Sequence, residues 1–437
     1  MTSVVMSRAQ LAAGSMSEAE MFQDVLARIA ADQKYMAWAW TYGSYEEAME
    51  RRWRGRRESQ PLTGLPLGVK DIFNSVTGTT EMGSPSWHGH HAGNDARVVA
   101  EFVYRGAVVV GKTTTAEFAV HALPPTLNPW NPDATPGTSS SGSAVAVALG
   151  HVPIALATQT AGSITRPASF TGVIGFKPTQ GVYPRTGVLK TCDPFDTIGF
   201  LCRYLEDVEP VFEATRVRGS DYPFVERGLR AASARAADPR KLRIARIQTP
   251  FTRHEEPAIT GAVDGFVASL PKDRFEIVDL DLTSLLADAD RLHEQIYHKA
   301  LSYYFKPERD AGDDFSPIMR DIFEAGDQVS AETYRANLEA LPTLRAAFAA
   351  ATANVDLICV ASTATTAPPR GVAELPDTSR YWTMLHLPTI SLPLFVHGEN
   401  SMPFAVQVVG VQKFAEPVLF RFLADAGLDS SCLKCFR

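Results

Sequence analysis

Two short segments rich in serine, threonine and glycine carry side chains suited to nucleophilic chemistry. The first, PGTSSSGS, runs from Pro136 to Ser143 and precedes the apolar stretch 144–149. A solvated linker would not lead into so apolar a helix, so this segment is predicted to bring hydroxyl and N–H groups to a helix N-terminus. The second segment, Thr160-Ala-Gly-Ser163, follows a short predicted strand. Both turns are expected at one edge of a sheet, where open α/β proteins build their sites.

A serine nucleophile needs a base and an oxyanion hole, and the histidines do not supply an obvious base. His88, His90 and His91 lie in the tract SWHGHH, which is more typical of a polar surface loop than of a metal site, since no acidic partner stands at ligand spacing. A structural role is the default for the isolated histidines His121, His151, His293, His298, His386 and His397. The chain also has no G-x-S-x-G nucleophile elbow.

Lys70 is a different kind of candidate base. It ends the apolar run Leu65–Val69, and lysine is rarely fully buried. Burial lowers the pKa of the ammonium group and so favours the neutral amine, which accepts protons. A lysine that reaches solvent or pairs with the neighbouring Asp71 explains the pattern equally well.

These segments resemble the amidase-signature hydrolases. The resemblance is carried by GLPLGVKDI (64–72), by the serine-rich segment 136–149 and by the segment 157–181 around Ser163. Further matching segments follow in the family's order: 106–119, 128–131, 196–199, 382–395 and 403–411. The match covers most of the chain and is weak between about 205 and 320. It implies an α/β fold with one large domain, in which a central twisted sheet, mostly parallel or mixed, is flanked by helices.

The resemblance also implies catalytic roles. Ser163 matches the nucleophile, Ser139 the bridging serine and Lys70 the base. The family's bridging serine follows a cis peptide bond, which here would join Thr138 to Ser139, where threonine replaces the usual glycine. The oxyanion hole is implied to consist of the backbone N–H groups of Thr160, Ala161, Gly162 and Ser163.

Three positions near Ser163 bear on specificity. Gln159 stands where many members have aspartate, and Ala161 where many have glycine; neither change removes a backbone donor. Arg166 resembles the arginine of the malonamidase-like branch, which helps bind a substrate carboxylate. A guanidinium suits a carboxylate because it donates two parallel hydrogen bonds. An arginine that only ties down the turn is an equal alternative.

The implied activity is hydrolysis of a C–N bond in a linear amide through a covalent acyl-enzyme, with no metal and no organic cofactor. Carbamates (urethanes), aryl amides and ureas are alternative substrates for the same triad. An amidotransferase A-type subunit, which shares the motifs but needs a partner, is a further alternative. The expected partners are a small-molecule amide or carbamate and a second copy of the chain in a homodimer. The pocket walls are expected from residues 120–130 and the poorly matching region 205–345.

A phosphate-binding loop is an alternative of another class. The segment GAVVVGKT, from Gly106 to Thr113, fits G-x-x-x-x-G-K-T. However, the β-branched residues Val108–Val110 fit a pleated strand better than an anion nest. The sequence therefore favours a buried strand here.

The elements that must position these residues alternate between strand and helix. Residues 17–60 are predicted to be helical, with a capping box at Ser17 and Glu20. Buried strands are predicted at 67–69, 107–110, 152–157, 173–176, 242–247, 275–280, 355–360, 389–392 and 404–409, and helices at 95–105, 143–149, 285–305 and 331–353. This pattern predicts one α/β domain over 1–437: a helical segment to about 60, a catalytic core to 205, a variable pocket region to 350, and a C-terminal part of the core.

Composition is that of an ordinary globular protein. The chain has 437 residues, of which 45% are hydrophobic and 21% charged, and its net charge of −7 gives no support for a nucleic-acid partner. The basic cluster 51–57 is interpreted as a solvated helix end. No signal sequence and no apolar stretch of membrane-spanning length is found, so no membrane partner is expected. The five scattered cysteines, including the lone pair Cys432 and Cys435, fit a reduced, cytoplasmic setting.

Overall fold

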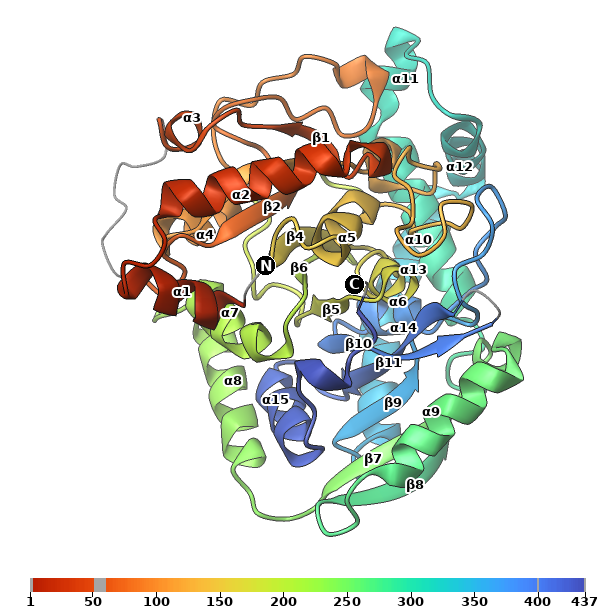
Figure 1. The fold of residues 1–437 in the computed structure, drawn as a ribbon. Coiled ribbons are helices and arrows are strands. Elements are labelled where there is room, and N and C mark those ends of the chain that lie inside the picture. The colour runs from red at the N-terminus through yellow and green to blue at the C-terminus, as the bar shows by residue number, and fades with distance from the viewer. Residues whose placement is uncertain (1–2, 51–59, 399–400, 436–437) are drawn as a thin grey trace.

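The computed structural model describes residues 3–50, 60–398 and 401–435. Its centre is an 11-stranded sheet with the strand order β1-β3-β2-β4-β6-β5-β10-β11-β9-β7-β8 (Figure 1). The strands are β1 (Trp38–Thr41), β2 (Pro66–Lys70), β3 (Val108–Thr113), β4 (Ile154–Gln159), β5 (Ile174–Lys177), β6 (Thr197–Cys202), β7 (Leu242–Gln248), β8 (Phe275–Asp281), β9 (Leu357–Ala361), β10 (Thr389–His397) and β11 (Met402–Gly410).

The sheet is mixed. One parallel block contains β3, β2 and β4, and a second contains β9, β7 and β8. Antiparallel pairings through β6, β5, β10 and β11 join the two blocks and reverse the direction of the second relative to the first. The carboxyl ends of β2, β3 and β4 therefore lie together at one end of the sheet, where Lys70 and the turn after β4 are found.

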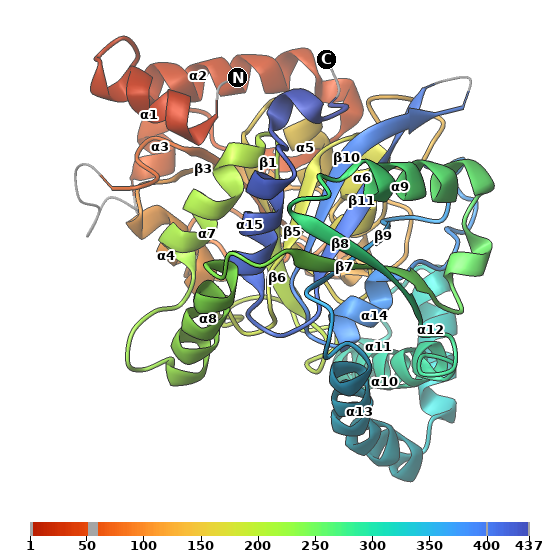
Figure 2. The same cartoon turned by 90° about the horizontal axis from the view of Figure 1, so that it is seen from below.

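Helices cover the sheet, and a further group of helices lies to one side of it. They are α1 (Val4–Ala12), α2 (Glu18–Ala31), α3 (Tyr45–Met49), α4 (Arg97–Tyr104), α5 (Ser141–Ala148), α6 (Thr165–Thr171), α7 (Val208–Thr215), α8 (Pro223–Ala236), α9 (Pro257–Ser269), α10 (Ala289–Tyr304), α11 (Lys306–Ala311), α12 (Pro317–Gln328), α13 (Ala331–Ala351), α14 (Ser379–Met384) and α15 (Glu416–Asp425). Figure 2 shows α10 to α13 gathered at one corner, with α14 between them and the sheet. Every residue of α5 and α6 is buried, so both lie inside the molecule.

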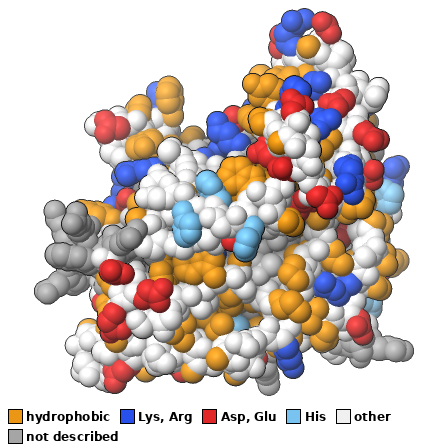
Figure 3. Space-filling model, turned by 90° about the horizontal axis from the view of Figure 1, so that it is seen from above, with side chains coloured by type: hydrophobic (Ala, Val, Ile, Leu, Met, Phe, Trp, Pro, Cys, Tyr) orange, Lys and Arg blue, Asp and Glu red, His pale blue; other side chains and the backbone are white. Residues whose placement is uncertain are grey.

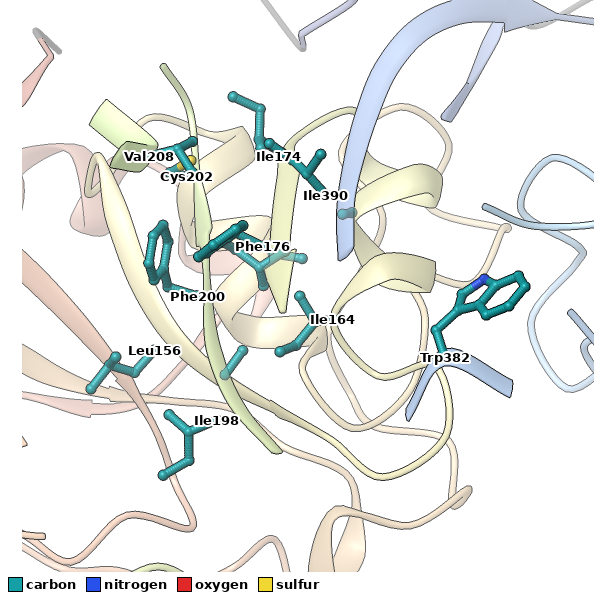
Figure 4. Packing of buried hydrophobic residues seen from close by; sticks show 14 of the residues in the cluster. Leu156, Ile164, Ile174, Phe176, Ile198, Phe200, Cys202, Val208, Trp382 and Ile390 are labelled. Atoms are coloured by element: carbon teal, nitrogen blue, oxygen red, sulfur yellow. The ribbon is translucent and has the colours of Figure 1, made fainter. Parts of the chain in front are cut away.

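The core beneath the predicted site is built from large apolar side chains of β4, β5 and β6. Phe176 and Phe200 are in contact with ring centroids 5.3 Å apart, and Val208 of α7 lies near Cys202 of β6 (Figure 4). Leu156 and Ile174 are likewise fully buried. Strand β4 is fully buried in this packing and ends at the turn that carries Ser163.

The strands and helices predicted from sequence are found, except in one segment that was predicted to be helical. The nine predicted strands correspond to β2–β5 and β7–β11, and the capping box of α2 is formed. The helical prediction for 17–60 was wrong at Trp38–Thr41, which forms β1, because its tryptophan-rich segment pairs with the edge of β3. Strand β6 was not predicted, and neither were several helices, among them α6 directly after Ser163. The basic cluster 51–57 lies outside the described residues.

The segment 106–113 does not form a phosphate-binding loop. Gly111 and Lys112 lie within the fully buried strand β3, as the β-branched residues before them indicated. The described helices include none that is both long and apolar enough to cross a membrane. On the face shown in Figure 3, lysine and arginine side chains are interspersed with acidic ones, so this face offers no continuous basic surface for a nucleic-acid backbone.

Candidate active site

Lys70 lies at the end of β2 and is completely buried. Its Nζ is 2.8 Å from Ser139 Oγ, 3.1 Å from Ser140 Oγ and 3.0 Å from Thr158 Oγ1. The Ser140 hydroxyl donates in turn to the carbonyl of Thr158 at 3.3 Å. The parallel pairing of β2 with β4 brings Thr158 alongside Lys70, and the loop before α5 supplies the two serines. Lys70 therefore contacts three hydroxyl groups and does not reach solvent.

The surroundings of Lys70 favour a neutral amine. Burial lowers the pKa of Lys70 well below its ordinary value of 10.5, and the charge of Asp196 opposes this shift only in part. Among the described residues no carboxylate forms an ion pair with Lys70. The ammonium form thus has neither contact with water nor an ion-paired carboxylate among the described residues.

Asp71 pairs with a different lysine. Lys112 of β3 places its Nζ 2.8 Å from Asp71 Oδ1 and 2.8 Å from Thr80 Oγ1, and all of these groups are buried. Burial raises the pKa of the Asp71 carboxyl, and Lys112 acts to lower it. Of the alternatives left open by sequence, an Asp71–Lys70 pair is thereby excluded.

The peptide bond before Ser139 departs from the expectation. All peptide bonds of the described residues are trans, so the cis bond implied between Thr138 and Ser139 is not present. A trans bond is favoured by about 2.5–4 kcal/mol when no proline follows. Ser139 reaches Lys70 with this trans bond.

Ser163 lies on the turn between β4 and α6 and is partly exposed. Its hydroxyl makes no hydrogen bond with any described residue. The structure therefore joins Lys70 to Ser139 but does not join Ser139 to Ser163. The side chain of Ser163 is free of competing partners among the residues that the structure describes.

The carbonyl groups of residues 160–162 in this turn each accept a hydrogen bond. His293 Nε2 lies 2.9 Å from the carbonyl oxygen of Thr160. The hydroxyl of Thr383 donates to the carbonyl of Ala161 at 2.8 Å, and the N–H of Arg166 donates to the carbonyl of Gly162 at 2.9 Å. Within a planar trans peptide unit the N–H points away from the C=O. The N–H groups of 161–163 accordingly point away from these partners, and within the described chain the N–H groups of 160–163 have no acceptor. They have the form of oxyanion-hole donors.

Gln159 fixes the start of α6. Its Oε1 accepts from the N–H groups of Ile164 at 2.8 Å and Thr165 at 3.0 Å, and its Nε2 donates to Thr383 Oγ1 at 2.9 Å. The side chain thus caps helix N–H groups that have no partner within the helix. This neutral amide takes the position where aspartate is common among the proteins that the sequence resembles.

Thr160 is anchored through its side chain as well. Its Oγ1 donates to Asp196 Oδ1 at 2.6 Å, and the same carboxylate accepts the hydroxyl of Thr191 at 2.6 Å and the N–H of Cys192 at 3.1 Å. Asp196 opens the segment 196–199, one of those that carry the resemblance. The segment therefore positions the turn that carries Ser163.

Arg166 is buried between two carboxylates. Its Nε lies 2.7 Å from Asp377 Oδ2, and its Nη1 lies 2.6 Å from Glu374 Oε2. Burial alone would lower the pKa of Arg166, but Asp377 and Glu374 raise it above its ordinary value. A Cβ on Gly162 would meet the guanidinium at 2.9 Å, so Arg166 packs directly against the turn. These contacts favour a structural role for Arg166, in which it stabilises the turn, over a role in binding a substrate carboxylate.

Sequence reasoning missed His293 and Thr383. Both donate to carbonyls of the turn that carries Ser163, but His293 is an isolated histidine in the sequence and Thr383 lies in a segment that was matched only as a whole. One contact joins the two segments expected to form the pocket walls, because the ring centroids of His121 and Tyr297 are 6.4 Å apart; the walls themselves stay a prediction. No sequence signal marks these contacts, because they join residues far apart in the chain.

Comparison with known proteins agrees with this fold. Residues 20–419 match the family model described as Amidase, and the chain belongs to this amidase-signature family. Among curated proteins, the A subunit of glutamyl-tRNA(Gln) amidotransferase from Roseiflexus castenholzii (strain DSM 13941 / HLO8) is 31% identical over 72% of this chain and 71% of the relative. The protein of the same name from Roseiflexus sp. (strain RS-1) is 29% identical over 96% of this chain and 94% of the relative.

Solved structures show the same architecture. One described as an amidase superposes with a TM-score of 0.82 at 25% identity, covering 98% of this chain and 100% of the other. A second, reported as a vestigial protein complex that reveals the evolutionary origins of an s-triazine catabolic enzyme, has a TM-score of 0.83 at 25% identity and covers 98% and 99%. The single large α/β domain with a mixed sheet is therefore the fold of this family.

Proposed function

We propose that this protein hydrolyses the C–N bond of a small amide or amide-like molecule, with Ser163 as nucleophile, Ser139 as proton relay and Lys70 as base. The observation that carries the proposal is the 2.8 Å contact between Lys70 and Ser139 at a fully buried site where Lys70 has no carboxylate ion pair among the described residues. A lysine held in this way is a proton acceptor rather than a permanent cation.

The proposed reaction begins with proton transfer. Neutral Lys70 takes the proton of Ser139, and Ser139 takes that of Ser163 as its Oγ attacks the carbonyl carbon. The N–H groups of the turn receive the developing oxyanion. Ser139 then protonates the leaving nitrogen, the C–N bond breaks, and water hydrolyses the acyl-enzyme. The Ser163 hydroxyl has no partner among the described residues, which supports this role, since no such contact must be displaced before it turns to Ser139.

The substrate class follows less directly from the site. Linear amides are the first candidates, and carbamates, aryl amides and ureas present the same carbonyl–nitrogen bond. Because Asp377 and Glu374 already neutralise Arg166, we do not assign a substrate carboxylate to this arginine. Membership of the malonamidase-like branch stays a prediction, as do the homodimer and the cytoplasmic setting.

An amidotransferase A-type subunit is the second candidate. The curated relatives bearing that name match the chain over most of its length and support it, and a protein of that kind works with a partner. The same triad would then release ammonia from an amide side chain for use by the partner. The two candidates share Ser163 and differ in whether the chain turns over simple amides alone.

The test uses the purified chain without partners. A panel of glutamine, small aliphatic amides, anilides and carbamates is assayed for ammonia or amine release, with Ser163→Ala as the matched inactive variant. Turnover of simple amides that disappears in Ser163→Ala supports the amidase. Turnover of glutamine only, or none until a partner is added, supports the amidotransferase. Undiminished turnover by Ser163→Ala would exclude both.

A further inference from the structure

His293 lies on α10, in the part of the chain where the sequence alone showed only a weak resemblance to the family. It is only 1% exposed, and its ring stacks on Phe195 with centroids 4.7 Å apart and planes inclined by 10°. Its Nε2 is 2.9 Å from the carbonyl oxygen of Thr160. Helix α10 thus contacts Thr160, the first residue of the turn 160–163 whose N–H groups form the proposed oxyanion hole.

The contact defines the tautomer of His293. A carbonyl oxygen only accepts, so Nε2 carries the hydrogen and donates it. Nδ1 is buried and has no partner among the described residues, so a proton there would be an uncompensated buried charge. Burial lowers the pKa of His293 to about 4, although the hydrogen bond to Thr160 acts in the opposite direction. The imidazole is therefore a neutral donor.

Thr160 is held from two sides. Its hydroxyl donates to Asp196 at 2.6 Å, and its carbonyl accepts from His293 at 2.9 Å. The first contact comes from a segment shared with the family, and the second comes from α10. The carbonyl of Thr160 and the N–H of Ala161 belong to one planar unit and point in opposite directions. Fixing the carbonyl consequently fixes the direction of the Ala161 N–H.

We propose that His293 is a positioning residue of the oxyanion hole: by donating to the Thr160 carbonyl it aims the Ala161 N–H at the site where the oxyanion forms. The proposal rests on the proposed function of Ser163. It assigns to α10 a part in the reaction itself, beyond the pocket wall that was predicted for this region. His293 does not touch the substrate and moves no proton.

Two substitutions separate the hydrogen bond from the ring. His293→Phe keeps the stacking on Phe195 and removes the donor, whereas His293→Gln keeps an N–H near the position of Nε2 and removes the ring. The exposed His254 provides a matched His→Phe control. The substrate-independent probe is diisopropyl fluorophosphate: Ser163 Oγ bonds to phosphorus, fluoride leaves, and the serine proton passes to Ser139 and Lys70. The phosphoryl oxygen occupies the oxyanion hole.

We expect His293→Phe to slow labelling of Ser163 about tenfold, because the hydrogen bond that orients the Thr160–Ala161 peptide group is lost. For the best substrate of the amide panel kcat should fall by a similar factor while KM stays within about twofold. His293→Gln and His254→Phe should remain near wild type. A fall in the midpoint of thermal unfolding without a change in the labelling rate would indicate a purely structural histidine.

Labelling of His293→Phe at the wild-type rate, or an equal loss in His293→Gln, would overturn the proposal. If His293→Phe does not fold, His293→Asn replaces it, since its amide is too short to reach Thr160 and the same slow labelling is expected. Ser163→Ala separates this outcome from a failure of the proposed function. If that variant is labelled like wild type, Ser163 is not the nucleophile, whatever His293 does.

Discussion

Two buried lysines on neighbouring strands have opposite surroundings. Lys70 ends β2, and Lys112 lies on β3 opposite Val69; both are 0% exposed. Lys70 contacts the hydroxyls of Ser139, Ser140 and Thr158, whereas Lys112 contacts the carboxylate of Asp71. Burial is therefore the same for both, and the partners differ.

The difference shows what makes a lysine a base. A carboxylate compensates a buried ammonium and keeps it charged, while hydroxyl groups accept from the amine without supplying a charge. Lys112 thus belongs to a structural ion pair, and Lys70 is available for proton transfer. The position of Asp71, directly after Lys70 in sequence, would have suggested the reverse.

The largest effect is expected from Lys70→Met. Removing the proposed base should lower kcat/KM by about 10²–10⁴ because proton transfer from Ser139 loses its acceptor. The labelling rate of Ser163 and the turnover of the best amide measure this loss, and circular dichroism monitors the fold. Near-wild-type turnover by a folded Lys70→Met protein would show that the two lysines do not differ in the way proposed.

Lys112→Met should instead reduce stability. It leaves the Asp71 carboxylate buried without a counter-charge, which costs about 3–5 kcal/mol in the free energy of unfolding. Denaturant titration measures this cost. The double variant Asp71→Asn/Lys112→Met is the control, since it removes both charges and should recover much of the loss. An unchanged free energy of unfolding in the single variant contradicts a structural ion pair.

The pH dependence of activity should report the lowered pKa of Lys70. Only the neutral amine accepts a proton, so kcat/KM should fall about tenfold for each pH unit below that pKa and level off above it. Because burial lowers the pKa well below 10.5, the midpoint of the alkaline rise is expected below 10.5. A profile that keeps rising through pH 10.5 would show that Lys70 is solvated or charged like an ordinary lysine.

A smaller effect is expected from Thr158→Val, which removes one of the three hydroxyls around Lys70 and keeps the shape of the side chain. Loss of one hydrogen bond should reduce kcat about three- to tenfold, because the amine of Lys70 is then held less firmly in position. Thr113→Val is the matched control, because the Thr113 hydroxyl bonds to Ser143 and not to Lys70. Equal losses in the two variants would point to a general packing effect.

Much of the fold was predictable because its central strands are short apolar runs between glycine-rich turns. Strand β1 was not, since its alternation is too short and its pairing with β3 is decided by contacts outside the segment. The sequence likewise did not predict that β7, β8 and β9 run in the direction opposite to β2. Which strands pair, and in what direction, depends on residues far apart in the chain.

The sequence predicted which residues form the candidate site better than it predicted which contacts they make. Lys70 and Ser139 meet as the resemblance implied, although through a trans peptide bond. For Arg166 the sequence left two interpretations, and only the fold brought Glu374 and Asp377 to it. His293 carried no signal at all, because an isolated histidine on a helix has a structural role more often than a catalytic one.

The sequence by itself determined the family, the chemical groups of the site and the buried strand that Lys70 ends, since these depend on local composition and on motifs in order. The tertiary structure decided which lysine keeps a counter-charge, which carbonyls of the Ser163 turn are tied down and which helix supplies their donors. Those properties are set by distances of a few ångströms between segments that lie far apart along the chain, and no local pattern records them.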